Sequence, residues 1–376
     1  MKSKCQTADV IVIGGGIHGC SAALHLARRG LKVIVLEKDH VARHASGVNA
    51  GGVRRLGRNL AEVPIAQAAW ELWQDMPALV DDDCGYRSSR YLKVARSEAE
   101  LSEARTRVGQ LNAMGFKHEE VIDRETLREV LPAASESCIG ALHVDADGAA
   151  LPFRTTMAFK YRAEVLGVRF QEGAPVIGVK RQGNNWILET PTEQFVTPSV
   201  VNACGAWGGK LASWLGDNLP IKARAPMLII TNRMPVFVGP LVGALGAALS
   251  FKQYDNGTIL IGGGVCGGAY PDENRTRLDL AGLTTFLKTA RAVIPAMKHA
   301  HVVRAWAGIE GYTPDKLPVI GRGQEPGVVH AFGFSAHGFQ LAPAVGSIVS
   351  HLVMGETPNL PIEPFRVRRF DAYPKA

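Results

Sequence analysis

The sequence predicts an α/β fold with a Rossmann-like nucleotide-binding domain, on three observations. The first observation is VIVI at Val10–Ile13, a continuous apolar run typical of a buried parallel strand. The second is the GGGIHG turn at 14–19, followed by apolar residues at helical spacing as far as Gly30, a helix C-cap. The third is another apolar run at 32–36, which ends on Glu37.

Each glycine of the Gly14-x-Gly16-x-x-Gly19 turn has a mechanical role in binding a dinucleotide. Gly14 permits the tight turn, Gly16 lets the backbone approach a pyrophosphate, and Gly19 lets the helix pack on the strand. Glu37 lies 18 residues after Gly19, where an acid accepts hydrogen bonds from a ribose hydroxyl. An acid here favours NAD or FAD over NADP. The alternative for an isolated GxGxxG motif is a glycine-rich turn without a ligand.

A second glycine-rich loop, HASGVNAGGVRRLGR at 44–58, distinguishes between these dinucleotides. An enzyme that binds only a nicotinamide dinucleotide has no need of such a loop directly after the ribose acid, whereas FAD extends alongside it. The sequence therefore predicts a flavoprotein. The alternative for this segment is a solvated basic loop.

The chain resembles the FAD-dependent D-amino-acid oxidase superfamily, in the branch of glycine oxidase, sarcosine oxidase β-type subunits and hydroxyproline dehydrogenase. Four stretches carry the resemblance: VIVIGGGIHG with Glu37, SGVNAGGVR, VVNACGAWGGKLA, and WAGIEGYTPDKLPVIG with GFSAHGFQLAPAVG. The resemblance implies a GR2-type FAD-binding domain formed by 1–84, 166–220 and 301–376. The substrate domain would then comprise 85–165 and 221–300, as an α+β domain that is built on a large mixed sheet and interleaved with the FAD-binding domain.

The resemblance also implies that FAD is bound noncovalently by these stretches and by the strand near GAPVIG. The implied cofactor-binding residues are Gly14, Gly16, Ile17, His18, Gly19, Glu37, Lys38, Ser46, Asn49, Ala50, Gly51, Gly52, Val176, Ala203, Gly205, Trp207, Gly308, Gly333, His337, Gly338, Phe339, Gln340 and Leu341. Residues 338–341 lead into an apolar helix. An N-terminus of this helix aimed at the flavin would stabilise the negative charge of reduced flavin.

Flavin chemistry requires the protein to orient the substrate rather than to supply a nucleophile. The candidates for this task are Arg54, Lys252, Gln253, Glu310, Tyr312, His337 and Gln340. Arginine holds a carboxylate through two parallel hydrogen bonds, so Arg54 is a candidate carboxylate clamp. Lys252 lies on a hairpin strand that the family uses near the substrate. The alternative is a solvated surface position for each cation, and a packing role for His337.

Three departures from the relatives bear on the activity. Glycine oxidases place a carboxylate-binding arginine in the WAG…TPD region, where this chain has Glu310. We therefore expect the carboxylate to be held elsewhere and Glu310 to meet the substrate nitrogen. Monomeric sarcosine oxidases attach flavin to a cysteine near TPD, and none lies between Trp306 and Gly321. They also activate oxygen with a lysine where this chain has Leu260, which puts oxidase activity in doubt.

The predicted reaction is oxidation of the C–N bond of a small amino acid by hydride transfer to flavin N5, giving an imine that hydrolyses to an oxo acid and an amine. A secondary or N-substituted substrate is favoured, of the sarcosine, iminodiacetate, opine or hydroxyproline type. The cations near the flavin and the net charge of +7 suit more than one carboxylate. One alternative is a D-amino-acid or hydroxyproline dehydrogenase that passes electrons to a quinone or partner subunit instead of O₂. Another is a noncatalytic flavin-binding subunit of a heteromeric complex.

Composition narrows the remaining possibilities. The 42 basic and 35 acidic residues include no Lys/Arg run typical of nucleic-acid binding. Six scattered cysteines without ligand spacing indicate reduced thiols, no metal site and a cytoplasmic location. No signal peptide or transmembrane segment is expected, and the apolar segment 236–251 is expected to be a partly exposed loop. Homo- and hetero-oligomers both stay open.

Local patterns predict three elements of the substrate domain. RYLKVAR at 90–96 reads as a strand, and SEAELSEARTRVGQLNAM reads as a helix that Gly115 ends. SFKQYDNGTILIGGG predicts a hairpin around Asp255-Asn256-Gly257.

Overall fold

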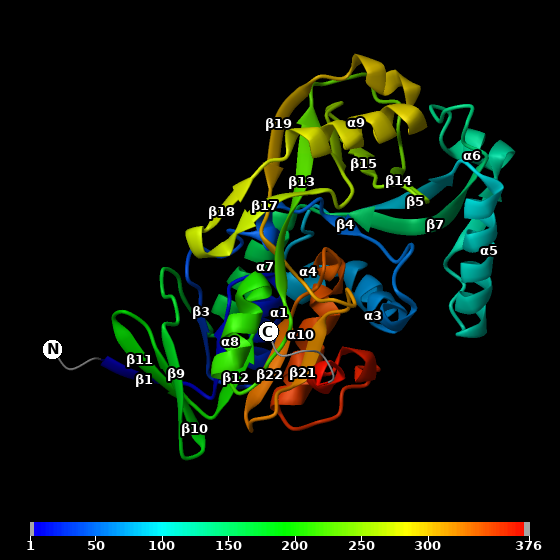
Figure 1. Cartoon of the computed structure of the whole chain (residues 1–376). Helices are drawn as coiled ribbons and strands as arrows, with labels where there is room; N and C mark the ends of the chain where they lie inside the picture. The colour runs from blue at the N-terminus through cyan, green and yellow to red at the C-terminus, as the bar shows by residue number, and fades with distance from the viewer. Residues whose placement is uncertain (1–3, 372–376) are drawn as a thin grey trace.

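The computed structural model describes residues 4–371, and two large sheets organise it (Figure 1). The first has six strands in the order β21-β22-β12-β2-β3-β8. All neighbours in it are parallel except β21 and β22. Its strands are β2 (Val10–Ile13), β3 (Val33–Leu36), β8 (Arg169–Gln171), β12 (Ser199–Asn202), β21 (Val319–Arg322) and β22 (Val328–Phe332).

The first βαβ unit of this sheet follows from its sequence. Every side chain of β2 and β3 is buried, as expected for parallel strands whose apolar runs are continuous. Helix α1 (Ile17–Arg28) begins directly after Gly16. It ends before Gly30, whose φ of +81° is a left-handed conformation that glycine adopts without strain. The predicted βαβ unit is thus confirmed, with its second strand beginning one residue later than predicted.

The second sheet is the predicted large mixed sheet, with twelve strands. Its main path is β18-β17-β13-β16-β15-β14-β5-β7-β4, while β19 and β20 pair with β13, and β6 pairs with β7. Its strands are β4 (Gly52–Val53), β5 (Arg87–Ala95), β6 (Glu120–Asp123), β7 (Gly140–Ala149), β13 (Lys222–Thr231), β14 (Leu241–Ala244), β15 (Ser250–Gln253), β16 (Ile259–Gly262), β17 (Cys266–Tyr270), β18 (Arg275–Arg277), β19 (Val302–Ala307) and β20 (Glu310–Tyr312).

The local predictions for this region are confirmed with one exception. The strand at 90–96 is part of β5, the helix is α5 (Glu98–Ala113), and β15 and β16 form the hairpin. The prediction of a partly exposed loop at 236–251 is wrong for 241–244, which form β14 and are all buried, whereas Val236 in the preceding loop is 61% exposed. β14 pairs with both β5 and β15, so its apolar residues fill the interior of a sheet.

The other elements complete the two units. A small sheet consists of β1 (Lys4–Thr7), β11 (Glu193–Thr197), β10 (Asn185–Glu189) and β9 (Gly178–Gln182). The remaining α-helices are α2 (Ala45–Val48), α3 (Val63–Trp73), α4 (Met76–Val80), α6 (Arg124–Val130), α7 (Pro152–Val165), α8 (Gly208–Trp214), α9 (Leu280–Val293) and α10 (Gly338–Val353). The 3-10 helices are η1 (Leu60–Glu62), η2 (Gly205–Trp207), η3 (Pro271–Glu273), η4 (Pro295–His299), η5 (Glu363–Phe365) and η6 (Val367–Phe370).

The two largest apolar cores hold the units together. The larger packs α1 against α7 and α10, and α3 against α10, and in Figure 1 these helices lie between the two large sheets. The other packs α9 onto the twelve-stranded sheet. The predicted division into two discontinuous domains stays a prediction; β4, β19 and β20 come from its nucleotide-binding segments but pair within the large sheet. No helix within 4–371 is long and apolar enough to cross a membrane.

Candidate active site

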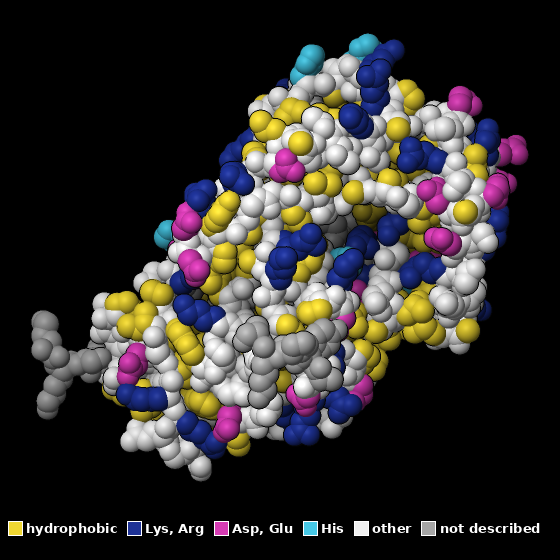
Figure 2. Space-filling view, viewed as in Figure 1, with side chains coloured by type: hydrophobic (Ala, Val, Ile, Leu, Met, Phe, Trp, Pro, Cys, Tyr) yellow, Lys and Arg dark blue, Asp and Glu magenta, His cyan; other side chains and the backbone are white. Residues whose placement is uncertain are grey.

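A cavity of about 870 Å³ lies between the carboxyl ends of β2, β3 and β12 and the strands of the large sheet. This edge of a parallel sheet is where α/β folds bind ligands. In Figure 2 the surface is hollowed near the centre of the view, and Lys and Arg side chains gather around the hollow. The predicted residues that line the cavity are Gly14, Gly16, Ile17, His18, Glu37, Lys38, Ser46, Asn49, Ala50, Gly51, Gly52, Arg54, Val176, Ala203, Gly205, Trp207, Gly308, Glu310, Gly333, His337, Gly338 and Phe339.

The β2–α1 turn leaves no room for side chains at its glycines. Gly14 has a φ of +107°, and a Cβ there would lie 2.5 Å from the carbonyl oxygen of Ala203. A Cβ on Gly19 would lie 1.9 Å from the carbonyl oxygen of Gly14. The first turn of α1 can therefore approach the strands closely, and the α1 N-terminus opens on the cavity.

Glu37 closes the other side of this turn. Its carboxylate accepts hydrogen bonds from the backbone N–H groups of Gly15, at 2.6 Å, and Asp39, at 2.8 Å. Burial nevertheless raises the pKa of Glu37 above its usual range. The carboxylate thus lies at the cavity wall at the end of β3, where the sequence predicts a ribose ligand.

A polar network covers the cavity beside η2. The Lys38 ammonium lies 4.2 Å from the centre of the Trp207 ring and donates to Asn274 Oδ1 at 2.6 Å. Asp39 Oδ2 accepts from Asn274 at 2.9 Å and lies 2.9 Å from His44 Nε2. The β17–β18 connection is therefore tied to the nucleotide-binding unit at this end.

The loop after α2 is fixed from three sides. Lys252 Nζ donates to the carbonyl oxygen of Ala50 at 2.7 Å, and Trp306 Nε1 donates to that of Val48 at 2.8 Å. Gly51 has a φ of +70°, and a Cβ there would lie 2.1 Å from the carbonyl oxygen of Ala150. Lys252 itself is buried, which lowers its pKa to about 8. Its side chain acts from behind the loop, since it lies outside the cavity lining.

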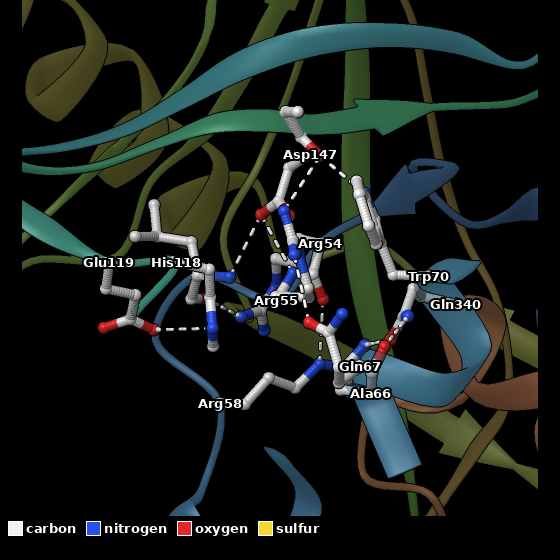
Figure 3. Close-up of polar contacts among 12 residues, drawn as sticks. Arg54, Arg55, Arg58, Ala66, Gln67, Trp70, His118, Glu119, Asp147 and Gln340 are labelled. Atoms are coloured by element: carbon white, nitrogen blue, oxygen red, sulfur yellow. Dashed lines mark hydrogen bonds and ion pairs between the residues drawn. The ribbon is translucent and has the colours of Figure 1, made fainter. Parts of the chain in front are cut away.

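The N-terminus of α10 opens on the same cavity. No side chain caps this helix, and Gly338 and Phe339 in its first turn line the cavity. Unpaired N–H groups at such a terminus favour a negative charge. Arg58 anchors the helix start by donating to the carbonyl oxygen of His337 and to Gln340 Oε1, both at 2.8 Å. Figure 3 shows Arg58 and Gln340.

The imidazole of His337 lies in a partly buried polar setting. Its Nδ1 atom is 3.4 Å from Glu62 Oε2. Burial lowers the pKa of His337 to about 4, so the ring is neutral near pH 7. Burial also lowers the pKa of the neighbouring His18 to about 3, and its ring stacks on Phe334 at 3.6 Å between centroids.

Glu310 is the acid that faces the cavity from the large sheet. Its buried Oε2 atom has no hydrogen-bond partner in the described part of the chain. Burial raises the pKa of Glu310 to about 7. A carboxyl group with this pKa can accept or release a proton at neutral pH.

The remaining predicted residues lie outside the lining, namely Gly19, Lys252, Gln253, Tyr312, Gln340 and Leu341. Gln253 uses its amide on the backbone around 235–238 and Gly257, which turns its polar atoms away from the cavity. Gln340 is fully buried and joins α10 to α3 by donating to the carbonyl oxygen of Ala66 at 2.8 Å. The Tyr312 ring packs on the Arg224 guanidinium, 5.2 Å from the ring centre.

Comparisons with known proteins agree with this geometry. The family described as DAO, FAD dependent oxidoreductase, matches residues 9–352. The chain belongs to this family. It is 28% identical over 419 residues to the hydrogen cyanide synthase subunit HcnC of Pseudomonas aeruginosa, which covers 99% of this chain and 98% of that protein. It is 28% identical over 380 residues to glycine oxidase of Bacillus subtilis, with 97% and 98% covered.

A solved structure supports the fold as well. The L-proline dehydrogenase from P. horikoshii matches with a TM-score of 0.90 and 29% identity, covering 98% of this chain and 99% of that chain. Membership of the DAO family confirms the resemblance inferred from the four sequence stretches, and it establishes FAD as the cofactor.

The residues of this DAO-family chain fit FAD. The cavity is long enough to connect the β2–α1 turn to the α10 N-terminus, because both line it. Close-packed glycines at one end leave the backbone accessible to a pyrophosphate, since a Cβ at Gly14 or Gly19 would collide with the backbone. At the other end, uncapped N–H groups of α10 match the anionic charge of a reduced flavin.

Sequence reasoning missed several residues of the cavity, namely His44, Arg58, Tyr91, Lys93 and Asn274. Tyr91 and Lys93 alternate on β5, so a period-2 reading of RYLKVAR places both on one face of the strand. That pattern could have identified them. Arg58 and Asn274 carried no such signal, since both reach the cavity from irregular segments.

Proposed function

We propose that this protein oxidises the C–N bond of a small amino acid with FAD as cofactor, and that it favours a secondary or N-substituted substrate. The observation that carries the proposal is the meeting of Arg54, Glu310 and the α10 N-terminus on one cavity. Two relatives are named for amino acids, a glycine oxidase and an L-proline dehydrogenase, which supports this substrate class.

Bound FAD supplies a hydride acceptor at N5. The protein must then hold the substrate with its reacting carbon oriented. Arg54 donates one hydrogen bond to the carbonyl oxygen of Leu56, at 2.6 Å, and its other nitrogen atoms have no partner within residues 4–371. They are available to hold the substrate carboxylate through charge-assisted hydrogen bonds.

Glu310 prepares the substrate nitrogen for oxidation. An amino acid carries a protonated amine in water, and this form has no lone pair to stabilise the developing imine. With a pKa of about 7, the Glu310 carboxylate can take that proton at neutral pH. Loss of the hydride then leaves an iminium ion, and water converts it to an oxo acid and an amine.

We further propose that FAD is bound noncovalently. No cysteine occurs between Trp306 and Gly321. Cys204 lines the cavity, but burial raises the pKa of its thiol well above its usual range and disfavours the reactive thiolate. Denaturation with acid should therefore release all the flavin from the protein, whereas a covalent link would keep it with the precipitate.

The electron acceptor after FAD defines a second candidate function. Leu260 is buried at the position where the resemblance implies an oxygen-activating lysine, which favours a dehydrogenase for a quinone or partner subunit. Lys252 on β15 pairs with Leu260 on β16, and its ammonium contacts the loop after α2 at Ala50. A lysine at this place supports an oxidase. Rapid mixing of the reduced protein with oxygenated buffer separates the two, because an oxidase reoxidises quickly and releases peroxide.

A noncatalytic subunit is the remaining alternative, because HcnC is named as a subunit of a synthase. The proposal predicts that the purified single chain, loaded with FAD, converts a secondary amino acid to stoichiometric oxo acid and amine. FAD binding without product from any amino acid would instead support the noncatalytic role.

A further inference from the structure

The cavity wall formed by β5 and the 54–58 loop carries more positive charge than the surrounding chain neutralises. Arg54, Arg58 and Lys93 all line the cavity. Arg54, Arg55 and Arg58 lie close together, with Glu119 on one side and Gln340 on the other (Figure 3). Among the described residues, three acids lie near this wall, Asp147, Glu62 and Glu119, and the ion pairs and hydrogen bonds of each are known.

Each nearby acid already has a cation or a backbone donor. Asp147 binds Arg55 at 3.2 Å, and Glu62 lies 3.7 Å from Arg58. Glu119 binds Arg107 through two hydrogen bonds, at 2.7 and 2.8 Å, and accepts another from the Gly57 N–H. Asp147 and Glu119 therefore have little capacity left for a further cation. The carboxylate of Glu62 has no hydrogen bond within the described residues, and its ion pair is with Arg58.

Arg54 and Lys93 are the cations left over at this wall. Among residues 4–371, no carboxylate oxygen lies within 4.0 Å of a side-chain nitrogen of either residue. Lys93 Nζ also has no hydrogen bond to any described residue, although the side chain is largely buried. Two partly buried cations without a counter-charge are costly for the fold unless an anion joins them.

The backbone makes room for the Lys93 ammonium. Gly57 has a φ of +66°, and a Cβ there would lie 2.3 Å from Lys93 Nζ. The ammonium therefore lies against bare backbone at Gly57. Tyr91, two residues earlier on β5, lines the cavity from the same face of the strand and is also buried. Its hydroxyl is a further donor for an anionic group.

We infer that Lys93 binds a second anionic group of the substrate, so that the protein prefers an amino acid with two carboxylates over its monocarboxylate counterpart. This inference rests on the proposed function, in which Arg54 holds the first carboxylate. Lys93 supplies the counter-charge for the second, and Tyr91 is placed to donate a hydrogen bond to it. A monocarboxylate would leave the Lys93 ammonium unpaired.

The charge of Lys93 should make this preference depend on pH. Burial, together with the nearby Arg54, Arg107 and Arg58, lowers the pKa of Lys93 to about 8 against the opposing effect of Glu119. The ammonium is thus present below pH 8 and lost above it. Lys252 has a similar pKa, but its ammonium contacts the carbonyl oxygen of Ala50 outside the cavity lining.

The test has a binding arm and a kinetic arm on the FAD-loaded protein. Malonate and acetate, which cannot be oxidised as amines, are titrated against the visible flavin spectrum. Iminodiacetate and sarcosine, which differ by one carboxylate, are compared as substrates. We expect each dicarboxylate to be favoured about 10- to 100-fold, as for one charged hydrogen bond. Malonate binding should weaken as the pH rises through 8.

Three variants identify the responsible side chain. Lys93→Met should bring both ratios close to one and remove the weakening of malonate binding around pH 8. Lys93→Arg should restore much of the preference. Lys117→Met, which removes an exposed lysine, should leave both ratios unchanged. Equal binding of malonate and acetate by the unaltered protein would overturn the inference, as would a Lys93→Met variant that weakens both ligands equally.

The two arms keep this inference separate from the proposed function. If no amino acid reduces the flavin, the proposed function fails, while the malonate titration still reports on Lys93. If sarcosine reduces the flavin as fast as iminodiacetate does, the proposed function stands and the preference for two carboxylates is refuted.

Discussion

The buried guanidinium of Arg58 connects the 54–58 loop to the first turn of α10. It is 2% exposed and donates to the carbonyl oxygens of Arg54, at 3.0 Å, and His337, at 2.8 Å, and to Gln340 Oε1. Its charge also balances Glu62, 3.7 Å away. Burial raises the pKa of Glu62, but His337 and Arg58 outweigh it and hold the pKa below its usual range, so the acid is ionised at neutral pH.

Arg58→Met should therefore leave three acceptors and one buried carboxylate without their partner. Removing one member of a buried ion pair costs about 3–5 kcal/mol. Unfolding entropy of about 2.1 cal/mol/K per residue, over 376 residues, converts 4 kcal/mol to a fall in Tm of about 5 °C. Calorimetry of the FAD-free protein measures this fall.

The matched control is Arg105→Met, because Arg105 forms an ion pair with Glu98 in which both side chains are mostly exposed. Its effect should stay within about 0.5 kcal/mol. FAD affinity provides a second readout, since a displaced α10 N-terminus should weaken binding in Arg58→Met alone. A Tm for Arg58→Met within 1 °C of the control would refute the assignment of Arg58 as the anchor of α10.

Three further predictions concern the cofactor and the chemistry. Gly19→Ala should weaken FAD binding about 10- to 100-fold, because its Cβ would lie 1.9 Å from the Gly14 carbonyl oxygen, while Gly109→Ala, in open space on α5, should not; equal flavin content after purification would contradict this. Glu310→Gln should slow flavin reduction about 10²- to 10⁴-fold and abolish the rise in rate as pH increases through 7, where the unaltered carboxyl group ionises; an unchanged pH profile in stopped-flow measurements would exclude Glu310 as the base. Lys252→Met should weaken FAD binding about 10-fold because the Ala50 carbonyl oxygen loses its donor, whereas exposed Lys298→Met serves as the control, and equal dissociation constants for the two variants would show that the contact is not needed.

The nucleotide-binding half could be predicted from the sequence because short local patterns determine its strands and turns. VIVI and VIVL are continuous apolar runs, and the glycines between them occupy positions where a Cβ would collide with backbone. Spacing alone therefore located the strands, the turn and Glu37. The hairpin of β15 and β16 was likewise predictable from its Asp-Asn-Gly turn.

The substrate half could not be predicted in the same way, because its side chains are brought together by pairing between strands that are far apart in the sequence. The apolar segment 236–251 has the composition of a loop broken by Pro240 and glycines, and only its pairing with β5 and β15 shows that β14 is a buried strand. Gln253 and Gln340 have polar side chains in motif-like positions. The amide of Gln253 bonds to backbone, and that of Gln340 bonds to Arg58 and to the carbonyl oxygen of Ala66, which the sequence does not reveal. Lys93 was not predicted because the charges around it, Arg54, Arg107 and Glu119, come from three separate segments of the chain. The sequence does not show that these segments meet.

The oxidation of an amino acid by bound FAD is the claim on which the rest depends. Anaerobic mixing of the FAD-loaded chain with sarcosine, iminodiacetate, proline and hydroxyproline, followed through the visible flavin absorbance, tests it most directly. The account predicts full bleaching by at least one of these secondary amino acids, at a rate that rises with pH through the Glu310 ionisation near 7. A flavin spectrum that stays oxidised with every amino acid tested would contradict it.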